Sequence, residues 1–126
     1  MNARNPIFIH YVYDMARARH FYETVFGVSP DFATGGWTTM DFGAFRLALH
    51  ILGPGRSMVS GQVDESPLPH AGLNLEVDDI ASLQRRITAA GGELLELREA
   101  NARVPDRVAT FRDTEGNGFE LRQRVR

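Results

Sequence analysis

The sequence predicts an α+β fold in which two βαβββ modules form a curved eight-stranded sheet, with the helices on its outer face. Three observations carry this prediction. The chain has 126 residues, which is enough for one domain with its own hydrophobic core. Strand-like and helix-like patterns alternate, and the order strand, helix, three strands occurs twice. Segments 12–27 and 77–92 share the pattern Val-x-Asp-apolar and a helix ending in Gly, with a constant offset of 65 residues between Asp14 and Asp79.

The first module spans about residues 6–52. Residues 7–13, IFIHYVY, form an apolar, aromatic and β-branched run that is typical of a buried strand. Asp14 follows as a helix N-cap, and Gly27 ends the helix. The helix carries an apolar stripe at Met15, Ala18, Tyr22 and Val25. Three further strands are expected near 31–34 and over 37–43 and 45–52.

The second module spans about residues 70–125 and repeats this order. Residues 53–69 are rich in Gly, Pro and Ser, lack periodicity, and are expected to connect the two modules within a single domain, 1–126. Residues 72–77 alternate as a half-buried strand, and Asp79 caps a helix with an apolar stripe. That stripe consists of Ile80, Leu83 and Ile87, and the helix ends at Gly91 and Gly92. The remaining strands are expected over 93–99, 107–113 and 118–124.

Composition narrows the possible classes of function. The 14 basic and 16 acidic residues nearly balance, so there is no electrostatic case for binding nucleic acid or an anionic membrane. The absence of cysteine excludes disulfides, thiolate metal sites and cysteine nucleophiles. No apolar run has the length of a signal-peptide core or of a membrane span, and we therefore expect a cytoplasmic protein.

Three segments carry motifs that belong together: VYDMARARHFYETVFGV, GLNLEVDDIASLQRRITAAGGE and FRDTEGNGFELRQ. Their order and spacing over residues 6–124 resemble those of the vicinal oxygen chelate superfamily. This superfamily includes glyoxalase I, extradiol dioxygenases, and fosfomycin- and bleomycin-resistance proteins. The resemblance implies two βαβββ modules that enclose a U-shaped cavity, often in a homodimer. It does not fix the activity, because one scaffold hosts many chemistries.

The resemblance also implies where a metal would bind. Active members of the superfamily hold a divalent metal at up to four strand positions, which in this chain are Ile7, Ala48, Gly72 and Glu120. Only Glu120 carries a donor atom, whereas a protein metal site normally needs about three side-chain ligands. We therefore expect no cofactor, and a Glu120 carboxylate that faces a ligand directly.

Strand alternation assigns further side chains to the same cavity. The expected ligand-binding residues are Ile7, Ile9, Tyr11, Ala48, His50, Asn74, Glu120 and Arg122. Trp37, at the start of a strand, is a further candidate whose face the pattern does not fix. Apolar walls with a few convergent polar groups are typical of small-molecule pockets. The alternative is that these small and apolar residues fill the cavity as core.

Four histidines have different expected roles. His10 is predicted to be a hydrogen-bonded structural residue under the first helix, and His20 to lie on the helix surface. His50 points the same way as Ala48 and is either an acid, base or donor toward a ligand, or a polar rim residue. His70 lies just before the strand over 72–77, and a displaced divalent metal site of His50, His70 and Glu120 remains an alternative.

Three functions are compatible with these residues. The leading hypothesis is a metal-independent homodimer that binds a small organic molecule, as bleomycin-resistance proteins do. The alternative is a lyase or isomerase that acts next to a carbonyl, with Glu120 as catalytic base or as ligand of a noncanonical metal, and His50 assisting. The third is a dimeric interaction module whose cavity is filled.

Overall fold

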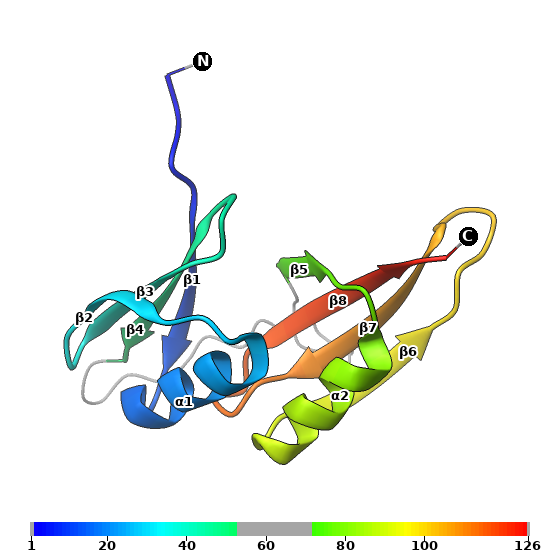
Figure 1. The fold of residues 1–126 in the computed structure, drawn as a ribbon. Helices are drawn as coiled ribbons and strands as arrows, with labels where there is room; N and C mark the ends of the chain where they lie inside the picture. The colour runs from blue at the N-terminus through cyan, green and yellow to red at the C-terminus, as the bar shows by residue number, and fades with distance from the viewer. Residues whose placement is uncertain (1, 53–71, 126) are drawn as a thin grey trace. The chain divides into compact units, whose positions relative to one another are not determined.

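The computed structural model describes residues 2–52 and 72–125. The expected connector 53–69 and His70 lie outside the described residues. The chain divides into two compact units, Met1–Met58 and Val59–Arg126, and each contains one βαβββ module (Figure 1). The predicted α+β class and the two modules are confirmed.

The first module contains one helix and a four-stranded sheet. Its elements are β1 Ile7–Val12, α1 Met15–Phe26, β2 Pro30–Ala33, β3 Trp37–Asp41 and β4 Arg46–Ile51. The sheet order is β1-β4-β3-β2, in which β1 runs parallel to β4 and the other neighbours are antiparallel. The weakly predicted strand near 31–34 is therefore real, and it forms the sheet edge opposite β1.

The second module repeats the arrangement. Its elements are β5 Leu73–Glu76, α2 Ile80–Ala89, β6 Glu93–Arg98, β7 Asp106–Arg112 and β8 Gly118–Arg124. The sheet order is β5-β8-β7-β6, with β5 parallel to β8. The eight predicted strands thus form two hydrogen-bonded sheets of four, one in each module.

The helix boundaries follow from the residues that the repeat singles out. Asp14 Oδ1 accepts a hydrogen bond from the backbone N–H of Arg17 at 3.0 Å, and Asp79 Oδ1 accepts one from Ala81 at 3.1 Å. These bonds satisfy N–H groups that a helix start leaves without an intrahelical partner. Gly27 ends α1 with φ of 67°, the left-handed conformation that glycine adopts without steric cost.

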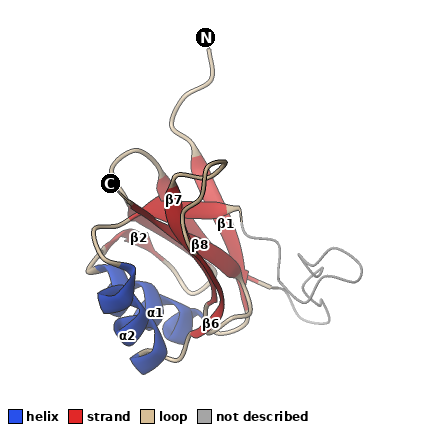
Figure 2. Cartoon of the chain, turned by 90° about the vertical axis from the view of Figure 1, so that its right-hand side faces the viewer, coloured by secondary structure: helices blue, strands red, loops and turns tan. Residues whose placement is uncertain are grey.

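In each module, the helix packs on one face of the sheet. Helix α1 contacts β4, and α2 contacts β6 and β8 (Figure 2). The first core is formed by large side chains that are fully buried, namely Val12, Phe21, Tyr22, Val25, Met40, Leu47 and Leu49. The second is formed by Ile80, Ile87, Phe111, Phe119 and Leu121. Among the residues described here, neither helix has the length and apolarity needed to cross a bilayer.

His10 belongs to the first core, as the sequence predicted. It is 5% exposed, and its Nδ1 lies 2.8 Å from the hydroxyl oxygen of Tyr22 on α1. The burial of the imidazole lowers the pKa of His10 to about 4, because a charged ring loses its hydration there. His10 is therefore a structural residue that stays neutral at physiological pH.

Candidate functional site

The face of the first sheet that carries Ile7, Ile9 and Tyr11 remains accessible. These alternate residues of β1 are 48%, 44% and 43% exposed, whereas His10 and Val12 between and beyond them are buried. In the strand register, Ile9 lies opposite Ala48, which is fully buried. Ala48 itself is therefore not accessible, whereas β1 presents a strip of exposed apolar surface.

A row of three aromatic rings crosses this face. Tyr11 on β1 and Trp37 on β3 are the register partners of His50 on β4. The His50 ring centroid is 5.3 Å from that of Tyr11 and 5.4 Å from that of Trp37, the latter at an interplanar angle of 76°. These separations are typical of attractive ring contacts. The structure thus puts Trp37 on the same face as His50, a point that the sequence pattern left open.

A polar cluster lies on the same sheet, four residues along β4 from His50. Arg46 Nε donates to Asp31 Oδ2 at 2.7 Å, and its Nη2 lies 3.9 Å from Asp41 Oδ2. The Thr39 hydroxyl donates to Asp31 Oδ1. The pKa of Asp31 is lowered first by this hydroxyl and then by the Arg46 guanidinium, since both stabilise the charged carboxylate.

Sequence reasoning missed Asp31 and Thr39. Asp31 lies in the short strand β2, where the pairing with β3 shifts register between Pro30 and Phe32. Counting alternate residues from β3 therefore does not give its face. Of this polar cluster, strand alternation indicates only Arg46, because Arg46 lies on the same face of its strand as Ala48.

In the second module, Glu120 on β8 lies at the centre of a hydrogen-bond network. Its Oε1 accepts from Asn74 Nδ2 at 3.1 Å. Its Oε2 accepts from Arg98 Nη2 at 3.0 Å and from the Thr110 hydroxyl at 3.2 Å. Asn74 and Thr110 are the register partners of Glu120 on either side, so three neighbouring strands position this carboxylate. The Glu120 side chain is 23% exposed.

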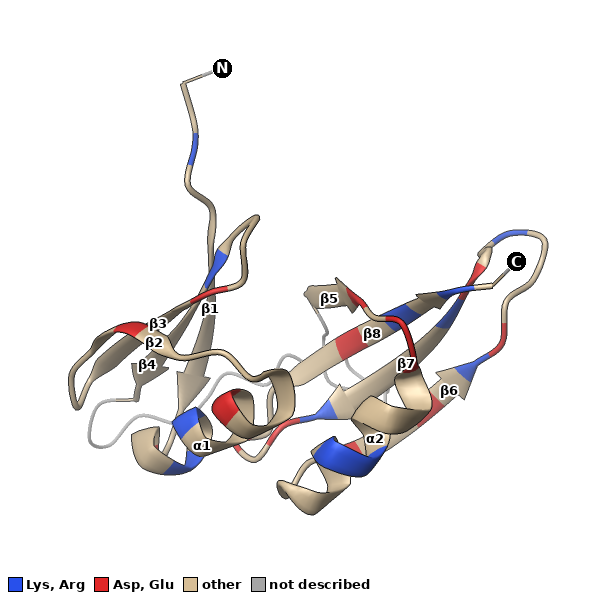
Figure 3. Ribbon diagram, viewed as in Figure 1, with Lys and Arg blue, Asp and Glu red and all other residues tan. Residues whose placement is uncertain are grey.

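The network extends along the sheet through two guanidinium groups. Arg122 Nη1 donates to Asn74 Oδ1 at 2.7 Å, and its Nη2 lies 3.6 Å from Glu76 Oε1. Arg98 Nε lies 3.7 Å from Glu96 Oε1. The network thus contains both acidic and basic residues of β5, β8 and β6 (Figure 3). We call the residues Asn74, Glu76, Glu96, Arg98, Thr110, Glu120 and Arg122 the Glu120 cluster.

Of the three residues that donate hydrogen bonds to Glu120, Arg98 and Thr110 are the two that the sequence did not indicate as site residues. The sequence could have predicted Thr110, because the turn after Arg112 fixes the antiparallel register of β7 and β8. Counting back from that turn pairs Thr110 with Glu120. The sequence could not have predicted Arg98 in this way, because the register of β6 and β7 shifts between Leu94 and Glu96. That irregularity changes which face each later residue of β6 occupies.

The residues at the superfamily's metal positions do not fit a metal. Ile7, Ala48 and Gly72 have no donor atom, and the oxygens of Glu120 already accept three hydrogen bonds, one from a cation. Over residues 2–52 and 72–125, no group of three or more histidine and carboxylate side chains is arranged to hold a metal ion. The alternative metal site of His50, His70 and Glu120 draws on both modules, because His50 lies in the first and Glu120 in the second.

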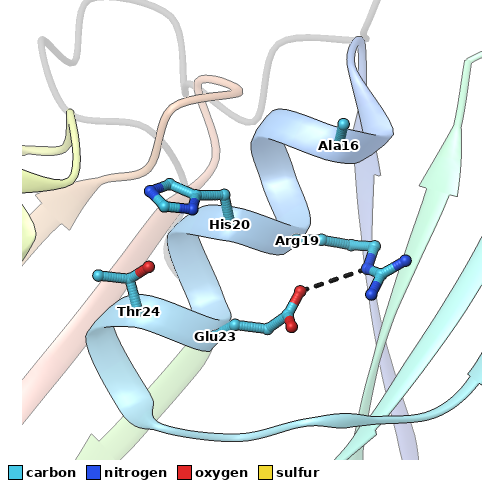
Figure 4. Close-up of a pocket in the computed structure, with 5 residues that line it drawn as sticks. All are labelled: Ala16, Arg19, His20, Glu23 and Thr24. Atoms are coloured by element: carbon cyan, nitrogen blue, oxygen red, sulfur yellow. Dashed lines mark hydrogen bonds and ion pairs between the residues drawn. The ribbon is translucent and has the colours of Figure 1, made fainter.

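His20 lies on the exposed side of α1, as the sequence predicted. It borders a surface hollow together with Ala16, Arg19, Glu23 and Thr24 (Figure 4). All five residues come from this one helix, and Arg19 Nε pairs with Glu23 Oε2 at 3.3 Å across one turn. The hollow is therefore the solvated face of a helix, and it presents no convergent set of polar groups.

The chain matches the family model described as a glyoxalase-like domain over residues 7–122, and it belongs to this family. The predicted membership of the superfamily of glyoxalases, bleomycin-resistance proteins and dioxygenases is thereby confirmed. Among curated proteins, none shows significant sequence similarity to this chain.

Several solved structures share the fold. A glyoxalase-related enzyme from Fulvimarina pelagi superposes with a TM-score of 0.74 at 22% identity, covering 95% of this chain and 87% of that chain. A glyoxalase/bleomycin resistance protein/dioxygenase family enzyme from Burkholderia phytofirmans PsJN superposes with a TM-score of 0.73 at 17% identity. The match covers 98% of this chain and 100% of that chain. The third structure is a mutant of the fosfomycin resistance protein FosX from Listeria monocytogenes, complexed with Mn(II) and 1S,2S-dihydroxypropylphosphonic acid. It superposes with a TM-score of 0.72 at 16% identity, and the match covers 99% of this chain and 92% of that chain. At these identities the similarity establishes the fold.

Proposed function

We propose that this protein binds a small organic molecule at the Glu120 cluster of the second module, without a resident metal. The observation that carries the proposal is the state of Glu120, whose oxygens accept from Asn74, Arg98 and Thr110. A guanidinium bonded to the carboxylate supplies the positive charge that a metal would otherwise provide. The carboxylate is thus available as a fixed hydrogen-bonding group for a ligand.

The aromatic row of the first module supports the same function. Tyr11, His50 and Trp37 present ring surface beside the exposed side chains of Ile7 and Ile9. Flat apolar surface combined with a small number of polar groups is the usual composition of a ligand site. The polar groups on this sheet are the His50 ring and, four residues along β4, the cluster around Arg46.

Native mass spectrometry combined with metal analysis of the purified protein tests the proposal. We expect no stoichiometric metal, and a mass adduct of a small organic molecule that denaturation releases. The matched variants are Glu120→Ala and Glu93→Ala, because Glu93 is an exposed carboxylate on the same sheet that pairs with Arg112 at 3.4 Å. Stoichiometric metal that is lost in Glu120→Ala and retained in Glu93→Ala would refute the proposal.

The second candidate is a lyase or isomerase in which Glu120 takes a proton next to a carbonyl. The observation in its favour is that a carboxylate has about four lone-pair sites, of which the three hydrogen bonds occupy three. One site remains, and the hydrogen bonds from β5, β6 and β7 hold the carboxylate in a fixed direction. Incorporation of solvent deuterium next to the carbonyl, lost in Glu120→Gln and retained in Glu93→Gln, would favour this candidate. Incorporation that persists in Glu120→Gln would eliminate it.

The proposal also includes a homodimer and a cytoplasmic location. The same native mass spectrum measures the number of subunits. A monomeric mass at micromolar concentration would remove the homodimer from the proposal and would leave ligand binding unaffected.

A further inference from the structure

A pocket of about 230 Å³ lies at the β6–β7 hairpin of the second module. Its lining residues are Arg98, Glu99, Asn101, Val104, Asp106 and Val108. The connection is held in shape by Asn101, whose Oδ1 accepts from the backbone N–H groups of Arg103 and Val104 at 2.8 and 3.0 Å. Such side-chain bonds fix the path of a turn. The pocket is therefore preformed by the hairpin itself.

Arg98 belongs both to this pocket and to the Glu120 cluster. In the ladder of β6 and β7 it is the register partner of Val108, which also lines the pocket. Its Nη2 donates to Glu120 Oε2 at 3.0 Å. One guanidinium thus forms part of the pocket wall and holds the Glu120 carboxylate.

The charges around the pocket are compensated. Arg98 has the carboxylates of Glu120 at 3.0 Å and Glu96 at 3.7 Å. The two acidic lining residues have basic partners in turn: Glu99 Oε1 lies 3.0 Å from Arg107 Nε, and Asp106 Oδ1 lies 3.9 Å from Arg124 Nε. Each charged residue that lines the pocket thus already has a partner of opposite charge, and an ionic ligand would have to compete with one of these ion pairs.

Arg98 nevertheless keeps hydrogen-bonding capacity. A guanidinium has five N–H donors in a planar fork, and the two carboxylates beside Arg98 engage only part of them. The Arg98 side chain is 49% exposed, so a ligand can reach it. Val104 and Val108 supply apolar wall in the same pocket. Donors whose positive charge is already opposed by carboxylates, beside apolar surface, suit an uncharged ligand that has an acceptor oxygen.

We propose that the hairpin pocket binds a small uncharged molecule whose carbonyl or amide oxygen accepts from Arg98 and whose apolar part lies against Val104 and Val108. The proposal rests on the proposed function and names the class of its ligand. The volume of about 230 Å³ is below the range of about 300–1,000 Å³ that holds drug-sized ligands, so the occupant is smaller than these. The phosphonate that accompanies Mn(II) in the FosX structure is an anion and falls outside this class.

Three isosteric probes test the class, namely isobutyramide, isobutyrate and isobutylammonium, titrated into the full-length protein while backbone amide NMR signals are recorded. We expect isobutyramide to shift the amide signals of Arg98, Val104 and Val108, and to bind at least about fivefold more tightly than either ion. Arg98→Met retains the aliphatic stem and should weaken isobutyramide about tenfold. Arg112→Met removes a guanidinium from the same two-strand ladder and should leave the affinity unchanged, because Arg112 pairs with Glu93 and does not line the pocket.

A change of charge supplies an independent test. Glu96→Gln removes one of the two carboxylates near Arg98, so isobutyrate should then bind about fivefold more tightly while isobutyramide is unaffected. The proposal is overturned if an ion binds the native protein as tightly as the amide, if Arg98→Met has no effect, or if no probe shifts the pocket signals. In each of these cases, a metal-free protein that carries a copurified small molecule would leave the proposed function standing.

Discussion

Arg98 Nη2 donates to Glu120 Oε2 at 3.0 Å, and this bond joins the outermost strand of the second sheet to the one superfamily metal position that retains a donor. The pair gives Glu120 a cation from its own chain. A divalent metal at this carboxylate would lie close to a guanidinium of like charge, which opposes its binding. The Arg98–Glu120 pair therefore supports the proposal of a ligand site without a resident metal.

The first prediction concerns the strength of this pair. Glu120→Gln keeps the shape of the side chain and removes its charge, so Arg98 loses its nearest anion. The Glu120 side chain is 23% exposed and Arg98 is 49% exposed, and solvent therefore screens part of the interaction. We expect a loss of about 1 kcal/mol in the free energy of unfolding, measured by urea denaturation.

Glu93→Gln is the matched control for that measurement. It breaks the pair with Arg112 at 3.4 Å in the same sheet, where the glutamate side chain is 64% exposed. Exposed ion pairs contribute little, and we expect less than about 0.5 kcal/mol. Equal losses in the two variants would mean that Glu120 is an ordinary surface residue.

Much of the fold could be predicted from the sequence, because its signals are local. Asp14 and Asp79 cap the two helices, and Gly27 ends the first of them, as the repeat indicated. Capping requires only the residue and its neighbours within one turn. Alternation within single strands likewise placed Tyr11 and His50 on one face, where they are now seen as ring partners.

The composition of the candidate site was predicted less completely, because it depends on register between strands. Glu120 and Asn74 come from strands whose pairing shows no shift, and the sequence indicated both. Arg98 and Asp31 lie in the edge strands β6 and β2, each of which has a register shift. A shift of one residue moves every later side chain to the other face. The periodicity within a single strand does not reveal such a shift.

The second prediction concerns the dependence of stability on pH through His10. Its pKa is about 4 in the folded protein and 6.5 for a solvated histidine side chain, so the unfolded chain binds more protons between these limits. The contribution of neutral His10 to the free energy of unfolding is fully present above pH 6.5 and is lost as the pH falls toward 4. A difference of about 2.5 pKa units corresponds to about 3 kcal/mol.

Urea denaturation at a series of pH values measures this dependence. His10→Gln removes the titrating ring, and the fall in stability between pH 6.5 and 4 should become correspondingly smaller than in the native protein. His20→Gln is the control, because His20 is exposed on α1 and its loss should leave the pH profile unchanged. A profile that is the same in native protein and His10→Gln would contradict the assignment.

The third prediction concerns Asp31, whose pKa is held below its ordinary value first by the Thr39 hydroxyl and then by Arg46. Thr39→Val keeps the β-branched shape and removes the hydroxyl. Carboxyl-detected NMR titration should then show the pKa of Asp31 moving up toward its ordinary value of 3.8. Arg46→Met should also move the pKa of Asp31 up, because it removes both a hydrogen bond and the Coulombic attraction of the guanidinium. A pKa of Asp31 that is unchanged in Thr39→Val would contradict the prediction.

The fourth prediction compares two glycines that both adopt left-handed backbone. Gly27 has φ of 67° and open space where a Cβ would stand, whereas Gly91 has φ of 98° and a Cβ there would lie 3.1 Å from Thr114 Cγ2. Gly27→Ala should therefore cost about 1 kcal/mol in the free energy of unfolding, from backbone strain alone. Gly91→Ala should cost more, because it adds a steric contact to the strain. Thr114→Ser removes that methyl group, and the double variant should recover the extra loss if the contact is its cause; a double variant as unstable as Gly91→Ala would show that the backbone conformation accounts for the whole effect.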